Sequence, residues 1–167
     1  MAKYHEQLPG VLSFFKNNPS AKAKMLATLS QENGLSLRLL DWFVTYFSKV
    51  RGVFVSSEDG KLMCVHAEYK NNLRAYSKRG FDPFCRRERI VLDNNFDLTS
   101  GEGMCTTIGQ LCFFRWAVES GIIDHCCTNV RDLEIALAEW SVSKSKVNRV
   151  IDRCPGYYTS IGSRVNF

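Results

Sequence analysis

The sequence predicts an α+β fold: a helix-rich single domain with a small antiparallel sheet and a basic C-terminal arm. Apolar residues recur at helical spacing over most of the chain. Between residues 52 and 66 the spacing changes to two apolar runs around Asp59-Gly60, which is typical of a β-hairpin because glycine accepts a positive φ. Hydrophobic residues make up 45% of the 167 residues, enough for one core that helices and strands share.

Two helices are expected near the N-terminus, over residues 4–16 and from Ser20 to about Ser30. Asn17-Asn18-Pro19 breaks the pattern between them, and Ser20 is a suitable N-cap for the second helix. Residues 1–34 are therefore interpreted as an N-terminal helical extension. A longer helix is predicted over residues 36–50, where large apolar side chains cover a wide face.

The remaining elements follow in chain order. Pro83 disfavours helical geometry at Asp82, so a helix after the hairpin must end before it. Thr107 and Gln110 match a capping box, in which an N-cap hydroxyl and the side chain three residues later bond each other's backbone N–H groups. The expected elements are strands at 53–55, 62–65, 89–92 and 104–106, and helices at 67–78, 107–120 and 130–140.

The core domain is predicted to span residues 35–140, because the hydrophobic periodicity stops at Trp140. The following SVSKSK stretch is interpreted as a linker, and residues 141–167 as a basic extended arm. Residues 144–167 hold five basic residues and one acidic residue, a net charge of +4 out of +5 for the whole chain. This asymmetry favours contact with an acidic partner, although a solvated tail that aids solubility would have the same composition.

The segment from His66 to Ile90 carries seven basic residues. Lys70, Arg74 and Lys78 recur every four residues, so on a helix they would form one positive stripe beside an apolar stripe. Aromatic residues lie between the charges, a pattern that suits nucleic acids and acidic protein surfaces equally well. The residues predicted to bind the partner are Lys70, Arg74, Lys78, Arg79, Arg86, Arg87, Arg89, Lys144, Lys146 and Arg149. The alternative is an ordinary solvated helix face.

The sequence contains no comparable sign of catalysis. GxxxxGK, GxGxxG, GxSxG and HExxH motifs are all absent. His125-Cys126-Cys127 is a weak zinc pattern because it lacks paired ligand spacing, so Cys126 is expected to pack inward instead. Cys85 lies beside two arginines and is the best candidate nucleophile, but a structural thiol is the simpler interpretation. We therefore expect no enzyme activity, no cofactor and no metal.

The compartment is predicted from two further features. The seven cysteines are odd in number and follow no disulfide framework, which fits a reducing environment. No apolar run reaches the roughly 20 residues of a membrane span, and the N-terminus has no apolar signal segment. We therefore expect a protein made and kept inside a cell, or inside something assembled there.

Two long motifs resemble a known family. AYSKRGFDPFCRRERI (75–90) and TTIGQLCFFRWAVESGIID (106–124), together with LSLRLLDWFVTYFSK (35–49), are similar to small uncharacterised proteins of large nucleocytoplasmic DNA viruses, of the iridovirus, marseillevirus and phycodnavirus type. The similarity spans about residues 35–140. It implies assembly in the host cytoplasm, and it brings no assigned activity.

Together these observations predict a virion structural protein, a minor capsid or capsid-associated component that docks acidic surfaces of neighbouring subunits. Other virion proteins are then the expected partners, and the virion and the host cytoplasm the expected locations. The alternative is a nucleic-acid-binding protein associated with the viral genome or with viral transcription. The sequence identifies no small-molecule substrate.

Overall fold

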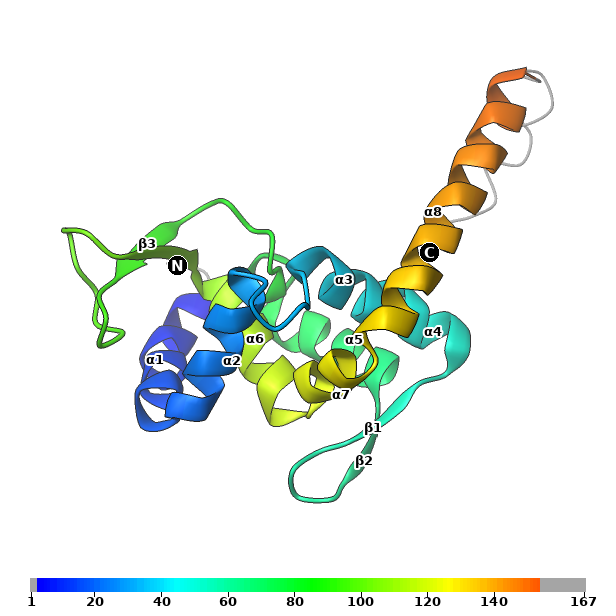
Figure 1. Cartoon of the computed structure of the whole chain (residues 1–167). Helices are drawn as coiled ribbons and strands as arrows, with labels where there is room; N and C mark the ends of the chain where they lie inside the picture. The colour runs from blue at the N-terminus through cyan, green and yellow to red at the C-terminus, as the bar shows by residue number, and fades with distance from the viewer. Residues whose placement is uncertain (1–2, 154–167) are drawn as a thin grey trace. The chain divides into compact units, whose positions relative to one another are not determined.

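The structure confirms the helix-rich α+β class, as Figure 1 shows. It is a computed structural model that describes the backbone of residues 3–153 and the side chains of residues 5–147. The chain divides into two compact units, one reaching to Val130 and one beginning at Arg131. None of the helices in the described part of the chain is long and apolar enough to cross a membrane.

The helices follow the predicted order, with two short ones that the sequence did not indicate, η3 and α7, and the helix predicted over residues 4–16 is divided into η1 and α1. In chain order they are η1 (Lys3–Gln7), α1 (Leu8–Asn17), α2 (Pro19–Leu29), α3 (Leu37–Trp42), η2 (Phe43–Phe47), α4 (Ser48–Arg51), α5 (Val65–Tyr76), η3 (Arg79–Phe81), α6 (Ile108–Glu119), α7 (Ile122–Thr128) and α8 (Val130–Arg153).

The first unit is built around α6. Its side chains are buried on most sides, including Leu111, Phe113 and Phe114, and it contacts α1, α2, α7 and η3. Thr107 begins the helix as predicted, since its side-chain oxygen accepts a hydrogen bond from the N–H of Gln110 at 3.2 Å. A central helix that is apolar nearly all round can only be stable when other elements cover it.

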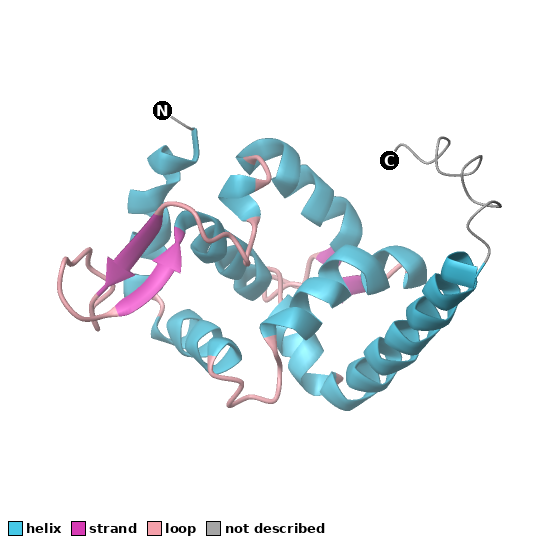
Figure 2. Cartoon of the chain, turned by 90° about the horizontal axis from the view of Figure 1, so that it is seen from above, coloured by secondary structure: helices cyan, strands magenta, loops and turns pink. Residues whose placement is uncertain are grey.

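The strands form two separate two-stranded sheets rather than one. Strand β1 (Phe54–Ser56) pairs antiparallel with β2 (Leu62–Cys64), and β3 (Arg89–Leu92) pairs antiparallel with β4 (Met104–Thr107). Figures 1 and 2 show the two sheets at different places in the first unit. The predicted hairpin turn is confirmed, with Gly60 at φ 75.

The division of the chain differs from the predicted core of residues 35–140 at both ends, because the first unit includes α1 and α2 and ends at Val130, not at Trp140. Helices α1 and α2 contact α6, and Phe15 and Met25 are fully buried. The predicted N-terminal extension is therefore not outside the core, because the apolar faces of α1 and α2 complete the core. The loop after β3 also packs against α1, since the ring centroid of Phe96 lies 5.6 Å from that of Phe15.

The predicted helix over residues 36–50 is confirmed with a local change of pitch. Ser36 caps α3 by accepting a hydrogen bond from the N–H of Leu39 at 3.1 Å. The segment η2 is a π-helix, and Gly52 ends α4 in the left-handed region at φ 63. A widened turn of this kind is rare and costs regular hydrogen bonds.

The interpretation of residues 141–146 as a linker is wrong, because α8 runs through them. The α8 sequence contains neither glycine nor proline, and lysine is a good helix former. The hydroxyls of Ser141, Ser143 and Ser145 each donate to the carbonyl oxygen four residues earlier, so these serines do not disrupt the helix. The unit that begins at Arg131 is therefore helical as far as Arg153, not an extended arm. Residues 154–167 lie outside the described part of the chain.

Candidate functional site

The predicted binding residues of the first unit are all exposed. We call them the basic surface: Lys70, Arg74, Lys78, Arg79, Arg86, Arg87 and Arg89. They lie on α5, at η3 and just before it, on the turn that leads into β3, and at Arg89, the first residue of β3. Lys144 and Lys146 are exposed on α8, in the other unit, and the side chain of Arg149 lies outside the described residues.

The predicted stripe of Lys70, Arg74 and Lys78 on one helix is wrong in one member. Helix α5 ends at Tyr76, because Ser77 adopts a positive φ of 67. Lys78 therefore precedes η3 instead of continuing the helix face. The helix ends well before Pro83, so the proline does not set its end.

Most aromatic residues of this segment are part of the core. Phe81 is fully buried, and its ring packs 5.6 Å from Tyr76, 6.1 Å from Tyr69 and 5.4 Å from Trp116. Phe84 differs, since 48% of it is exposed. Tyr69 and Tyr76 are half-buried and pack against Phe81, so Phe84 is the one exposed ring of this segment.

A glycine at the start of α6 allows the backbone of the turn between α5 and β3 to lie very close to α6. A Cβ atom at Gly109 would lie 2.4 Å from the backbone oxygen of Arg79 and 3.1 Å from that of Asp82. Contacts that short do not occur between ordinary atoms, so only glycine fits. The backbone below the basic surface is thus seated directly on α6.

The side chain of Gln110 fastens the next part of this turn. Its Nε2 donates to the backbone oxygen of Pro83 at 3.0 Å, and its Oε1 accepts from the Thr106 hydroxyl at 2.7 Å. The capping box predicted from Thr107 and Gln110 is therefore only half formed. The sequence signal marked Gln110 as a cap, and it did not reveal this longer-range role.

A cavity of about 300 Å³ opens where the turn meets β4. We call it the arginine cavity. Its lining includes Arg86 and Arg89, the thiols Cys85 and Cys105, and the half-exposed ring of Phe84, and it includes no carboxylate. A cavity of this size is at the lower end of the range for small-ligand pockets. It favours an anionic group.

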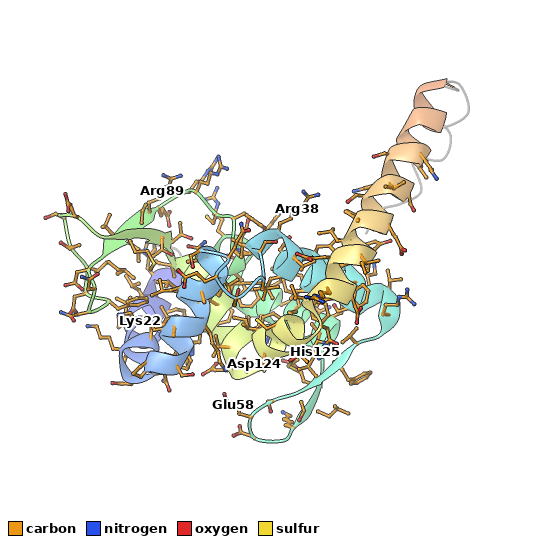
Figure 3. The ribbon with its side chains drawn as sticks, in the orientation of Figure 1. Lys22, Arg38, Glu58, Arg89, Asp124 and His125 are labelled. Carbon is orange, nitrogen blue, oxygen red and sulfur yellow. The ribbon has the colours of Figure 1, made fainter. Side chains whose placement is uncertain are left out.

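The arginines of this turn keep their charge available. Among the described residues, no ion pair involves Arg86, Arg87 or Arg89, whereas Glu88 between them pairs with His5 at 3.2 Å. Figure 3 shows Arg89 and Arg38 along the same upper edge of the view. Leu37, the neighbour of Arg38, also lines the arginine cavity. Arg38 was not among the predicted binding residues, because it lies far from the arginines of the turn in the sequence.

Asp41 of α3 and Asp82 of the turn after η3 form an acidic pair. Burial, and to a smaller extent the charge of Asp82, raises the pKa of Asp41 to about 6. Burial likewise raises the pKa of Tyr69, with both carboxylates contributing. Asp82 is engaged structurally, since its Oδ1 accepts from the N–H of Phe84 at 2.9 Å. None of these three side chains lines the arginine cavity.

The cysteines show no arrangement for metal binding in the described part of the chain, where no group of three potential ligands is suitably placed. Cys126 is fully buried, as expected for inward packing, and burial raises its pKa well above the usual range. Burial also raises the pKa of Cys112 to about 11. Cys85, the candidate nucleophile, has its Sγ 3.8 Å from the backbone oxygen of Arg87.

A second cluster of polar groups has a structural explanation. Glu58, Asp124 and His125 line a cavity of about 370 Å³, and Figure 3 shows all three in the lower part of the view. The Nζ of Lys24 lies 2.7 Å from Asp124 and 3.9 Å from Glu58. The lysine pairs with Asp124 and lies near Glu58, so it links α2 to α7 and to the hairpin.

Comparison with known proteins gives two matches. The model of a protein family described as a family of unknown function, DUF7197, matches residues 3–152. Uncharacterized protein L507 of Acanthamoeba polyphaga mimivirus is 34% identical over 130 residues, which cover 75% of this chain and 50% of the relative. The matched region thus spans about half the length of this curated relative. No solved structure matches the chain. The mimivirus relative is consistent with the resemblance to proteins of large DNA viruses, without specifying the virus type.

Proposed function

We propose, for a chain that belongs to the DUF7197 family and has a relative in a giant virus, a structural role in the virus particle. In this role the protein is a minor capsid or capsid-associated component. It docks an acidic surface of a neighbouring subunit through the basic surface. No catalytic step is part of the proposal.

The single observation that carries the proposal is the set of arginines on the turn before β3 and at the first residue of β3. Within the described residues Arg86, Arg87 and Arg89 have no acidic partner, and the turn beneath them is fixed to α6 by Gln110 and Gly109. Arginine is favoured in protein interfaces because its planar guanidinium binds carboxylates through two hydrogen bonds. A rigid backbone lowers the entropy lost when these side chains dock.

Nucleic acid is the second candidate, since unpaired arginines also suit phosphate groups. The burial of Phe81 and the packing of Tyr69 and Tyr76 against it weaken this alternative for single strands. Proteins that bind single strands without sequence preference usually present several exposed rings for base stacking. Here Phe84 is the exposed ring of the segment.

The test is charge reversal at two exposed positions outside the arginine cavity. Arg74→Glu combined with Arg87→Glu is expected to deplete the protein from purified particles at least tenfold, with the fold intact by circular dichroism. The matched control is Arg51→Glu combined with Lys61→Glu, which reverses two exposed charges at the end of α4 and in the β1–β2 turn. The control should be incorporated normally.

Binding to nucleic acid is measured in parallel. If the genome is the partner, affinity should fall linearly on a log–log plot against salt, and the double reversal should reduce the slope. Normal incorporation of the double-reversal variant would contradict the structural role. Unchanged nucleic-acid affinity in the same variant would exclude the second candidate as well.

A further inference from the structure

The arginine cavity continues into a second cavity along β4. This apolar cavity of about 740 Å³ lies between α2 and β4, and its walls include Ala23, Leu26 and Ala27. Cys105 and Gln110 line both cavities, so the two meet there. Leu26 is 38% exposed, so its side chain is accessible from the cavity. We call the combined feature the β4 groove.

The backbone at the centre of the β4 groove is open to a further strand. The edge of β3 that faces away from β4 is already paired. There the N–H of Thr99 donates to the backbone oxygen of Val91 at 3.0 Å, and Leu98 forms an isolated antiparallel β-bridge with Leu92. In an antiparallel pair the N–H and C=O of one residue point to the same side and alternate along the strand. Val91 and its partner Cys105 therefore form a non-hydrogen-bonded pair.

It follows that the N–H and C=O of Cys105 point away from β3, toward the outer edge of β4. No backbone hydrogen bond outside regular elements involves Cys105 in the part of the chain that the structure describes. Unpaired edges of this kind accept an additional strand from another chain. The open backbone lies where the two cavities meet, so an added strand would place side chains in both.

The two cavities of the β4 groove carry opposite charges. Arg86 and Arg89 line the arginine cavity, and Glu32 lines the apolar cavity. None of the ion pairs among the described residues uses these three side chains. An occupant with an acidic end next to an apolar residue is therefore complementary to the groove. A nucleic-acid strand is not, because the apolar wall and the Glu32 carboxylate would face its phosphates.

We propose that the β4 groove binds an extended acidic peptide segment of a partner protein by strand addition to β4. The acidic side chain enters the arginine cavity and pairs with Arg86 and Arg89. A neighbouring apolar side chain enters the apolar cavity against Leu26, and the peptide backbone bonds to Cys105. This inference deepens the proposed function, on which it rests for the identity of the partner as a protein.

Synthetic fluorescein-labelled peptides test the proposal on the full chain. In one peptide aspartate alternates with leucine, in a second lysine replaces aspartate, and in a third serine replaces leucine. Polythymidine is the fourth probe. The first peptide is expected to bind at least tenfold more tightly than the other three, as measured by fluorescence anisotropy. Equal binding of the lysine peptide, tighter binding of polythymidine, or no binding of any peptide would overturn the proposal.

Three variants locate the site. Arg89→Glu should lower the affinity for the aspartate–leucine peptide at least tenfold. Leu26→Asn should lower this affinity severalfold without any change of charge. The matched control is Arg51→Glu, which makes the same charge change at the end of α4, at an exposed side chain that lines neither cavity and lies outside the basic surface. It should alter affinity less than twofold. An equal loss in the control would show general charge attraction and not a groove.

Backbone pairing has its own readout. Bound peptide is expected to slow amide hydrogen exchange at Cys105, because its N–H becomes hydrogen-bonded, while the amides of the β1–β2 hairpin remain unchanged. Unchanged exchange at Cys105 with saturating peptide would rule out strand addition. Peptide binding uses isolated protein, whereas the structural role is read from particles. A negative peptide-binding result therefore does not change the result of the particle-incorporation assay. A negative incorporation result likewise leaves peptide binding measurable on the isolated protein.

Discussion

The side-chain amide of Gln110 donates to the backbone oxygen of Pro83 at 3.0 Å and so ties the arginine-bearing turn to the first turn of α6. The same amide accepts from the hydroxyl of Thr106, the last residue but one of β4. One side chain therefore joins the turn, the strand and the helix. Its position at the junction of both cavities makes it the main support of the candidate site.

Gln110→Ala is expected to destabilise the protein by about 1–2 kcal/mol, because it removes two partly buried side-chain hydrogen bonds and leaves the Pro83 oxygen without that donor. Chemical denaturation measures this loss. The affinity for an acidic partner should also fall, since the turn becomes less rigid. Glu119→Ala is the control at the other end of α6, where an exposed contact with Arg115 is lost. It should cost no more than about 0.5 kcal/mol.

The fold class and most elements could be predicted from the sequence, because their signals are local. Periodicity identifies α2 and α6, and Asp59-Gly60 marks the hairpin turn. The N-cap Thr107 begins α6 where the sequence places it. The end of α5 at Ser77 could not be predicted, since a serine at positive φ is set by tertiary contacts and not by its own propensity.

Only the positive charge of the candidate site could be predicted from the sequence. The arginines of the turn stand together in the sequence, whereas the cavity that they line also depends on Cys105 and Gln110, about 20 residues later. The apolar wall comes from α2, at the other end of the unit's sequence. Contacts between distant segments leave no local pattern, so the β4 groove required the structure.

Gly109→Ala is expected to destabilise the protein by about 1–3 kcal/mol, although alanine favours helices, because the new Cβ would meet the backbone oxygen of Arg79 at 2.4 Å. Thermal or chemical denaturation measures the effect. Gly10→Ala is the matched control in α1, where a Cβ meets nothing within 4 Å. There the same change should stabilise the protein by up to about 1 kcal/mol. A stabilising effect at Gly109 would contradict the close seating of the turn on α6.

The seven cysteines are predicted to be reduced and free of metal in the native protein. Among the six cysteines that the structure describes, iodoacetamide should label the exposed Cys105 first under native conditions, and it should label Cys112 and Cys126 last, because burial shields these thiols and raises their pKa. Mass spectrometry of peptides measures the order. In denaturant all seven should react, so a lower count would reveal a disulfide. Stoichiometric zinc in elemental analysis would also contradict this prediction.

Asp41→Asn is expected to stabilise the protein near pH 7 and to have almost no effect near pH 3.5. The pKa of Asp41 is raised from 3.8 to about 6, so the folded state holds this proton more tightly than the unfolded state. As pH rises from about 4 to 6, the unfolded chain releases the proton first, and the folded protein loses stability. Asparagine removes this loss, which we expect to be of the order of 1–2 kcal/mol after allowance for solvent screening.

Denaturation of both proteins at pH 3.5, 5 and 7 measures the difference. The gain should grow across this range and level off above the raised pKa of Asp41. Asp82→Asn provides the control, because it removes the neighbouring charge that contributes to this pKa shift while its amide oxygen can still accept from the N–H of Phe84. In that background the gain from Asp41→Asn should shrink and not vanish, since burial is the larger cause of the shift. An equal gain at all three pH values would show that Asp41 is not penalised as a buried charge.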